Sequence, residues 1–403
     1  MRLLVVGAGP AGVRCAVRVA ERMPEAEVTL ISGEAALPYD RVALSRLLAG
    51  DVEVRDLITH RVPDLRAHGI AYRPATPVAA VDREARVVVT AHGERVPYDV
   101  LVLATGSRAL RLPLPGADLP GVVLYRDLAD VRAMLAAARS RTPAVVIGGG
   151  LLGLEAAAGL AARGMSVTVV HAVDWPMERQ LDPEAGALLA KRLGGRGIRF
   201  AMPAATVSIE GHGRVEAVCL ADGRRIPAKL VVMAVGIRPD VALARDAGLD
   251  VGRGVKVDRA GRTADPAIWA IGECAEHDGM TVGLVAPALA QAEVAAEAIA
   301  GGAAAWAPRA DAAALKVSGT AVWSAGEIAA RDAEPITLRD ELADAYRRLW
   351  LRGGRLIGAV LYGDTADSGF YLDLISSGRS VQEIRAALAL GPAFATYPKE
   401  EAA

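Results

Sequence analysis

Two glycine-rich turns hold the residues best placed for chemistry in this 403-residue sequence. Each fits the pattern G-x-G-x-x-G, in which the turn brings backbone N–H groups against a pyrophosphate at the positive N-terminal end of a helix. The candidate binding residues of these turns are Gly7, Gly9, Pro10, Ala11, Gly12, Gly148, Gly150, Leu151, Leu152 and Gly153. Two copies of the pattern predict two dinucleotide sites.

The elements around both turns follow the same order. Apolar strands are expected at residues 3–6 and 144–147, directly before the turns, and Ala-rich helices follow them to about residues 23 and 163. A second strand is then expected at 27–31 in the first copy and at 166–170 in the second. Each copy is therefore the first half of a doubly wound α/β unit. The alternative is a pair of accidental glycine turns, and the strand and helix around both copies argue against it.

Composition excludes several classes of function. With 46 basic and 47 acidic residues, the formal net charge of -1 does not favour nucleic acid or an anionic membrane as partner. Residues 144–162 are apolar enough for a crude membrane window, but they contain Glu155 and five glycines, so strand, turn and helix fit them better. The six histidines show no i, i+4 ligand spacing, and we expect no metal site.

The cysteines indicate the compartment and limit the redox chemistry. Cys15, Cys219 and Cys274 are widely spaced and odd in number, so we expect no disulfide framework and a cytoplasmic location. The N-terminus has too short an apolar run for a signal peptide. Without a Cys-x-x-Cys motif, these residues supply neither a dithiol relay nor four thiolates for an iron–sulfur cluster.

Turn-rich segments divide the chain. Proline and glycine gather at 111–121 and again at 236–240, and a Gly/Ala/Pro linker is expected at 301–311. About 90 residues follow the linker with alternating apolar patterns and no glycine fingerprint, as is typical of a small α+β domain. Further strands are expected at 86–90, 100–104, 229–234 and 268–271.

Three more segments resemble a known family. Residues 102–106 (V-L-A-T-G) resemble the strand and turn at which two-dinucleotide flavoproteins leave the FAD domain. Residues 263–273 (T-A-D-P-A-I-W-A-I-G-E) resemble their second FAD fingerprint. Residues 39–46 resemble the Y-[DN]-R-x-x-L-S-[KR] segment of ferredoxin-, rubredoxin- and nitrite-reductase-type flavoproteins. The chain is thus identified as a member of the FAD-dependent pyridine nucleotide-disulfide oxidoreductase-fold family.

The resemblance implies an α/β fold with two doubly wound, Rossmann-like dinucleotide-binding domains. The FAD domain is discontinuous, at 1–113 and 241–308, and the NAD(P) domain at 114–240 is inserted in it. A small α+β interface domain follows at 309–403, where core packing is the better assignment for Trp323, Trp350, Phe370 and Tyr371. In related folds this domain covers the flavin and often takes part in a dimer.

The resemblance also assigns roles to residues. Glu273 accepts hydrogen bonds from the flavin ribitol, Arg46 is the cation near the reactive edge of the flavin, and Glu155 orients the nicotinamide. Other residues assigned to cofactor binding are Tyr39, Arg41, Ala104, Thr105, Gly106, Gly236, Gly272 and Pro287. The competing interpretations are a surface carboxylate for Glu273, a solvated helix residue for Glu155, and an exposed salt-bridged turn at residues 39–41. Leu44-Ser45 stands where disulfide reductases have a redox cysteine, which argues against thiol chemistry.

Two positions depart from the family pattern. The acid that binds the adenosine ribose at the end of the second strand is replaced by Ser32 in the first unit, with Glu34 two positions on. In the second unit the position holds His171, with Asp174 nearby. An acid there favours NADH and an arginine cluster favours NADPH. Since neither is present, both donors stay open, with a preference for NADH.

One branch of the family resembles the chain most. Residues 148–181 (G-G-G-L-L-G-L-E to M-E-R-Q-L), 272–277 and 361–375 resemble the flavin half of the NAD(P)H assimilatory nitrite reductase large subunit and the flavin subunit of assimilatory nitrate reductase. Cluster-binding cysteines and a sirohaem domain follow in those large subunits, so we expect that this chain does not reduce nitrite by itself. The expected partner is an iron–sulfur protein: a nitrate or nitrite reductase subunit, or a ferredoxin.

Two other functions stay open. The first is an NADH:rubredoxin or NADH:ferredoxin reductase of an oxygenase system, which has the same flavin chemistry and another acceptor. The second is a flavin-bound interaction protein that turns over slowly and signals by dimerisation. The sequence leaves undecided the acceptor, the oligomeric state and the role of the C-terminal domain.

Overall fold

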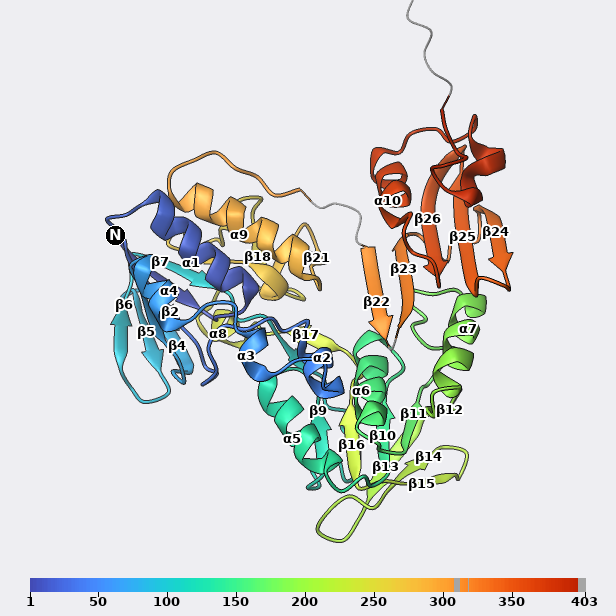
Figure 1. Ribbon diagram of the computed structural model, residues 1–403. Helices are drawn as coiled ribbons and strands as arrows, with labels where there is room; N and C mark the ends of the chain where they lie inside the picture. The colour runs from blue at the N-terminus through green and yellow to red at the C-terminus, as the bar shows by residue number, and fades with distance from the viewer. Residues whose placement is uncertain (308–311, 318, 398–403) are drawn as a thin grey trace, which may run out of the picture.

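A computed structural model describes residues 1–307, 312–317 and 319–397. Two parallel five-stranded sheets, each covered by helices, form the two larger parts of the molecule, and an antiparallel sheet forms the third (Figure 1). The predicted fold class is confirmed. Residues 308–311 of the expected linker lie outside the described residues.

The first parallel sheet has the strand order β19-β7-β1-β2-β3. Its strands are β1 (Arg2–Val6), β2 (Glu27–Ile31), β3 (Ile70–Arg73), β7 (Val100–Leu103) and β19 (Ile268–Ala270). Helices α1 (Pro10–Arg22) and α9 (Val285–Ile299) lie side by side over it (Figure 1). The apolar side of α1 is buried, and its arginines face α9, where Arg14 and Arg18 bind Glu293 at 3.0 and 2.8 Å.

The second parallel sheet has the strand order β12-β11-β10-β16-β9. Its strands are β9 (Val122–Leu124), β10 (Ala144–Ile147), β11 (Val167–Val170), β12 (Arg199–Ala201) and β16 (Leu230–Met233). Helices α5 (Leu128–Ala138), α6 (Leu151–Ala162) and α7 (Pro183–Gly194) belong to it. The strands and helices predicted around both turns are confirmed, with ends that differ by one or two residues. The domain boundaries stay a prediction.

Smaller elements complete the two parts. Three-stranded sheets are formed by β4 (Val78–Asp82), β5 (Val87–Thr90) and β6 (Arg95–Pro97), by β13 (Thr206–Glu210), β14 (Ala217–Leu220) and β15 (Arg225–Pro227), and by β18 (Val255–Val257), β20 (Ala275–His277) and β21 (Met280–Thr281). Strands β8 (Ser107–Ala109) and β17 (Ile237–Pro239) pair where the chain passes from one parallel sheet to the other and back. The short helices are α3 (Val54–Leu57), α4 (Val62–Ala67), α8 (Ala242–Asp246) and the 3₁₀ turn Gly272–Cys274.

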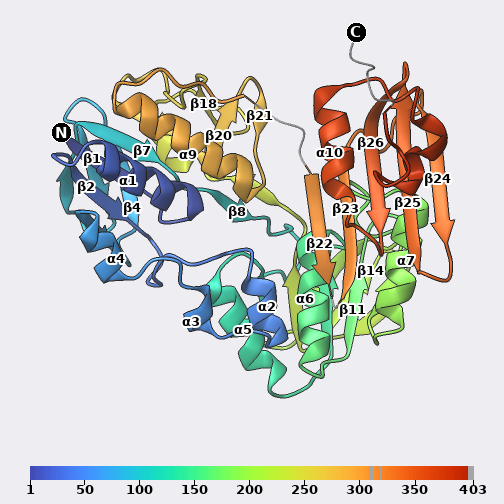
Figure 2. The same cartoon turned by 45° about the horizontal axis from the view of Figure 1, so that its top comes forward.

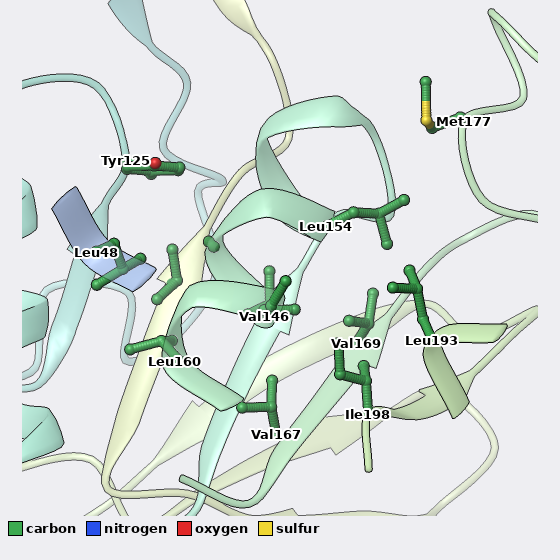
Figure 3. Packing of buried hydrophobic residues seen from close by; sticks show 14 of the residues in the cluster. Leu48, Tyr125, Val146, Leu154, Leu160, Val167, Val169, Met177, Leu193 and Ile198 are labelled. Carbon is green, nitrogen blue, oxygen red and sulfur yellow. The ribbon is translucent and has the colours of Figure 1, made fainter. Parts of the chain in front are cut away.

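Helix α2 (Leu44–Ala49) comes from early in the chain but packs against α6, a helix of the second parallel sheet. Leu48 is fully buried against α6, where a Cβ added to Gly159 would lie 2.7 Å from its Cγ. Arg163, just after α6, donates to the carbonyls of Leu47 and Leu48 at 3.1 and 2.8 Å, so the end of α2 is capped by the other part. Figure 3 shows Leu48 beside Leu160.

The C-terminal part is an antiparallel sheet in the order β22-β23-β26-β25-β24. Its elements are β22 (Ala312–Val317), β23 (Thr320–Gly326), β24 (Glu334–Asp340), β25 (Ala345–Arg352), β26 (Arg355–Tyr362), α10 (Ser368–Ser377) and the 3₁₀ turn Arg385–Leu390. Trp323, Trp350 and Tyr371 are buried, as predicted, and Phe370 is partly buried.

This C-terminal sheet contacts the second parallel sheet's helices α6 and α7 (Figures 1 and 2). The hydroxyl of Tyr346 donates to buried Asp182, the N-cap of α7, at 2.9 Å. Arg192 pairs with Asp344 at the exposed rim of this contact. In the part of the chain that the structure describes, no helix combines the length and apolar character that crossing a membrane requires.

Candidate functional site

One cavity of about 1590 Å³ connects the two glycine turns. It is larger than the space that a single small ligand needs, about 300–1,000 Å³. Residues of both parallel sheets line it, at the carboxyl ends of β1, β2, β7, β10, β11 and β16, where open α/β sheets bind ligands. Ala314, on β22, also lines it.

Each glycine turn packs closely against the start of its helix at one glycine and is open to the surroundings at another. A Cβ on Gly12 would lie 1.9 Å from the carbonyl oxygen of Gly7, and a Cβ on Gly153 equally 1.9 Å from that of Gly148. At Gly9, by contrast, a Cβ would meet nothing within 4 Å, and the same holds for Gly150. Gly9 and Gly150 are the N-caps of α1 and α6 and offer no side chain to the first-turn N–H groups. These donors fit a pyrophosphate in each turn.

Glu34 lies just beyond the end of β2 in the first unit. Its carboxylate accepts from the Tyr39 hydroxyl at 2.7 Å and pairs with Arg41 at 2.6 Å, and its N–H donates to the Ser32 hydroxyl at 3.1 Å. Desolvation raises the pKa of Tyr39, because the ring is buried beneath the cavity wall. Tyr39 and Arg41 thus belong to a partly buried network, whereas Asp40 between them is exposed.

Glu273 is bound by residues from the link between the two sheets. It pairs with Arg126 and accepts from the Ser107 hydroxyl at 2.8 Å, and its side chain is 20% exposed. Arg126 lies just after β9, and its own carbonyl accepts from Arg41 at 3.0 Å. A carboxylate held in this way at the cavity wall is not a freely solvated surface group.

Glu155 reaches the same cavity from α6. Burial raises its pKa to about 7, and the nearby Ser45 hydroxyl acts in the opposite direction. Burial also raises the pKa of Tyr125, and the charge of Glu155 adds to that effect. The side chain is therefore not a solvated helix residue, and a cofactor amide is a suitable partner for it.

His171 follows β11 at the second strand end and is 9% exposed. Its Nδ1 accepts from the Gly149 N–H at 3.1 Å, and its Nε2 lies 3.1 Å from Glu178 Oε2. Asp174, the acid considered from the sequence, is exposed and does not line the cavity, whereas Glu178 does.

The structure brings most of the predicted site residues to one place. The cavity is lined by Gly7, Gly9, Pro10, Ala11, Ser32, Glu34, Arg41, Ala104, Thr105, Gly106, Gly148, Gly150, Leu151, Leu152, Glu155, His171, Gly236, Gly272 and Glu273. Gly12 and Gly153 lie behind the turns as packing positions, and Tyr39 acts on the wall through Glu34. Arg46 is exposed on α2 outside the lining, and Pro287 in the first turn of α9 is outside it too.

Sequence reasoning missed Arg126, Ser107 and Glu178 as residues of the cavity. Arg126 is 147 positions from Glu273, and no local pattern connects the two. Glu178 belongs to the run M-E-R-Q-L, which carries part of the family resemblance but indicates no role for this residue. Among the described residues, no group of three or more His, Cys, Asp or Glu side chains is arranged to hold a metal.

Two known family models match this chain, one over its first 298 residues and one over its C-terminal sheet region. Residues 1–298 match the family described as pyridine nucleotide-disulphide oxidoreductase, and residues 312–379 match the rubredoxin NAD+ reductase C-terminal domain. The chain is 40% identical to nitrite reductase [NAD(P)H] of Bacillus subtilis over 95% of its length and 48% of the relative's. It is 36% identical to the assimilatory nitrate reductase electron transfer subunit of the same organism over 99% of its length and 53% of the relative's.

The chain spans about half the length of these two curated relatives. Among solved structures, the ferredoxin reductase for the CYP199A2 system from Rhodopseudomonas palustris superposes with a TM-score of 0.87 at 31% identity, over 94% of this chain and 95% of that one. The family match covers most of the chain, and both glycine turns that the cavity joins lie within the matched residues. The chain belongs to the pyridine nucleotide-disulphide oxidoreductase family.

Proposed function

We propose that this chain is an FAD-dependent reductase that takes electrons from NADH or NADPH. It passes them to an iron–sulfur or metalloenzyme acceptor outside these 403 residues, in nitrate or nitrite assimilation. The observation that carries the proposal is the cavity of about 1590 Å³ that reaches both turns and exceeds the space that one small ligand needs. The names of the two Bacillus subtilis relatives support the pathway.

The residues divide between the two ligands by their position. The first turn, Ser32, Glu34 and Glu273 would hold FAD. The second turn, together with the strand end at which His171 lies, would hold the nicotinamide dinucleotide. When bound, FAD accepts an electron pair from reduced nicotinamide and releases electrons singly. The chain would supply positions and charges: the α1 and α6 N-termini would face the anionic pyrophosphates, and Glu155 would offer a carboxyl group to the carboxamide.

The cysteines support an acceptor outside these residues. Among the described residues that line the cavity there is no cysteine, and Cys15 and Cys274 are buried elsewhere. Burial raises the pKa of both thiols, which disfavours the reactive thiolate. A cytoplasmic location and the predicted domain boundaries are parts of the same proposal.

A reductase for rubredoxin or ferredoxin in an oxygenase system is the second candidate. It is favoured by the match of residues 312–379 to the rubredoxin NAD+ reductase C-terminal domain and by the likeness to the ferredoxin reductase from Rhodopseudomonas palustris. The two candidates share the flavin chemistry and differ only in the acceptor.

Anaerobic mixing of the purified, FAD-loaded protein with NADH or NADPH tests the proposal. We expect the flavin absorbance near about 450 nm to bleach within milliseconds to seconds, since that band belongs to the oxidised cofactor. Absence of bleaching with both donors would contradict both reductase candidates and leave the flavin-bound interaction protein. Steady-state rates with ferredoxin, rubredoxin and a clustered nitrite reductase domain as acceptors then decide between the two.

A further inference from the structure

His171 closes a hydrogen-bonded bridge at the end of β11. The Gly149 N–H donates to Nδ1 at 3.1 Å, so Nδ1 carries a lone pair and the neutral ring carries its proton on Nε2. Nε2 lies 3.1 Å from Glu178 Oε2 and donates to it. Both ring nitrogens are thus in use, and His171 itself has no nitrogen left for a ligand.

The segment that carries Glu178 is fixed against the glycine turn. Met177 is buried, and its N–H donates to the carbonyl of Gly149 at 2.9 Å. Met177 belongs to the buried cluster drawn in Figure 3, where it lies on the loop at the edge of the view. The Trp175 indole donates to the carbonyl of Leu181 at 2.9 Å, which closes the loop on itself. Glu178 therefore stands at a defined place and not on a free loop.

Gly149 is the middle glycine of the turn, at a position the G-x-G-x-x-G pattern leaves open. A Cβ there would lie 2.8 Å from Cγ of His171 and 3.0 Å from its Cδ2. The imidazole thus packs on the bare backbone of the turn. Gly149, His171 and Glu178 form one interlocked group, in which the histidine holds the carboxylate at the strand end.

The end of the second strand is where a doubly wound unit meets the adenosine ribose, and a carboxylate there accepts from the ribose hydroxyls. In this chain the carboxylate comes from Glu178, seven residues beyond His171, and both side chains line the cavity. Among the described residues, no hydrogen bond reaches its other oxygen, Oε1. That oxygen can accept a ribose hydroxyl, and its charge repels a 2′-phosphate.

We propose that Glu178, positioned by His171, makes the second unit select NADH over NADPH. The inference rests on the proposed function, because it takes the second unit to be the nicotinamide dinucleotide site. Arg179 is the competing feature: it lines the same cavity, and an exposed guanidinium there would favour a 2′-phosphate. Glu178 differs from it in being held by His171 at the strand end.

The test is a binding measurement that needs no flavin chemistry. NAD+ and NADP+ are titrated by calorimetry into the purified FAD-loaded protein, with ADP-ribose and 2′-phospho-ADP-ribose as shorter probes. We expect NAD+ to bind at least about tenfold tighter than NADP+, as a charge-assisted hydrogen bond permits. In Glu178→Gln the ratio should fall to within about threefold, because the repulsion is gone.

Glu184→Gln is the matched control, since that carboxylate lies on α7 and pairs with Arg339. It should keep the wild-type ratio. Equal affinity of the wild type for NAD+ and NADP+, or an unchanged ratio in Glu178→Gln, overturns the inference. A ratio that responds to Arg179→Ala and not to Glu178→Gln overturns it as well and assigns the choice to the arginine.

The positioning role of His171 has its own test. Gly149→Ala should push the imidazole away and weaken NAD+ binding about tenfold, and His171→Ala should do the same. Both variants break the same bridge between Gly149, His171 and Glu178, so the double variant should bind NAD+ no more weakly than either single variant. If the two residues acted independently, their losses of binding free energy would add. Additive losses in the dissociation constant would contradict the bridge. The melting temperature of each variant shows whether it is folded.

The outcomes separate this inference from the proposed function. A preference for NAD+ that depends on Glu178, without bleaching of the flavin by NADH, keeps the inference and removes the reductase. If NADH and NADPH both bleach the flavin, and the protein binds NAD+ and NADP+ with equal affinity, the reductase is kept and the inference is removed. Failure of the protein to bind either nucleotide removes both.

Discussion

The two glycine turns have the same backbone although we propose different ligands for them. Gly7 and Gly148 both adopt a φ of +112°. A Cβ on Gly7 would lie 2.2 Å from the carbonyl oxygen of Ala104, and a Cβ on Gly148 would lie 2.3 Å from that of Ala234. This common geometry serves what the two dinucleotides share, the pyrophosphate.

The units differ just beyond their second strands. In the first, Glu34 is held by Tyr39 and Arg41, and in the second Glu178 is held by His171. In both, the acid lies beyond the strand end and is fixed by side chains near it: Tyr39 and Arg41 follow Glu34, whereas His171 precedes Glu178. In the proposed assignment, the turn therefore sets the class of ligand, while residues outside the turn distinguish one dinucleotide from the other.

The largest effect is expected from Gly7→Ala and Gly148→Ala. Each adds a Cβ that collides with backbone at a φ that L-residues avoid, at a cost of about 3 kcal/mol or more. The expected outcomes differ by ligand: Gly7→Ala releases FAD, and Gly148→Ala keeps FAD and loses nucleotide binding. Flavin fluorescence after gel filtration and calorimetric titration with NAD+ measure the two losses.

Gly93→Ala is the control for the strain alone, since Gly93 has a φ of +81° and open space around it. It should cost about 1 kcal/mol without affecting either ligand. If Gly148→Ala released FAD as readily as Gly7→Ala, the assignment of one ligand to each unit would be wrong.

The second-largest effect is expected at Glu155 and concerns the pH dependence of stability, in which α6 should differ from α1. Its pKa of about 7 exceeds its ordinary value of 4.5, so between these pH values the folded state holds more protons than the unfolded state. Stability therefore falls as pH rises through this window, by about 3 kcal/mol at most. Glu155→Gln should match the wild type near pH 4.5 and exceed it at pH 8 in urea unfolding.

The equivalent position two residues after the last glycine of the first turn is Arg14, which pairs with Glu293 at a half-exposed site. Because a guanidinium stays charged throughout, the difference in stability between Arg14→Gln and the wild type should not change between pH 5 and 8. A gain for Glu155→Gln that is equal at both pH values would show that the carboxyl is not buried as described.

Arg126→Ala should have a smaller effect at the link between the units. It leaves Glu273 without its cation at a site where both side chains are about 20% exposed, and we expect a loss of about 1–3 kcal/mol and weaker FAD retention. Thermal unfolding and the dissociation constant of FAD measure these changes. Arg108→Ala is the control: its pair with Asp240 is 2.7 Å long but the arginine is 71% exposed, so less than about 1 kcal/mol should be lost. Equal losses in the two variants would contradict the role of Glu273.

Glu293→Gln should give the smallest effect. The carboxylate joins Arg14 and Arg18 of α1 to α9 at the surface, so we expect a loss of about 0.5 kcal/mol that shrinks further in salt. Urea unfolding at low and high ionic strength measures it. A large and salt-independent loss would show that α1 depends on these charges and not on its apolar side.

The sequence predicts those parts that local chemistry determines. The strands around the turns are short apolar runs, and the glycines are needed by the adjoining backbone, so both follow from neighbours in the chain. Arg46 is assigned to the flavin by resemblance, and in the structure it lies on the exposed side of α2. Leu44, Leu47 and Leu48 form the buried side of α2, and position 46 falls on the opposite side.

The remaining residues depend on how distant segments meet. Arg126 reaches Glu273 only because β8 and β17 bring the two sheets together. Glu178 returns to the strand end because the loop turns at Met177, which has a φ of +56° although it is not a glycine. No pattern of periodicity or propensity marks such a turn, so the sequence draws attention to Asp174, the acid nearer to the strand end.

The packing of α2 on α6 has a consequence for protein engineering. Although residues 44–49 precede the second unit by about 70 positions, Leu48 packs against Gly159, and Arg163 caps the helix. A chimera that takes residues 122–233 from a relative would bring a foreign surface to this helix. The transplanted segment and residues 44–49 should therefore be exchanged together, as one structural module made of two stretches of chain.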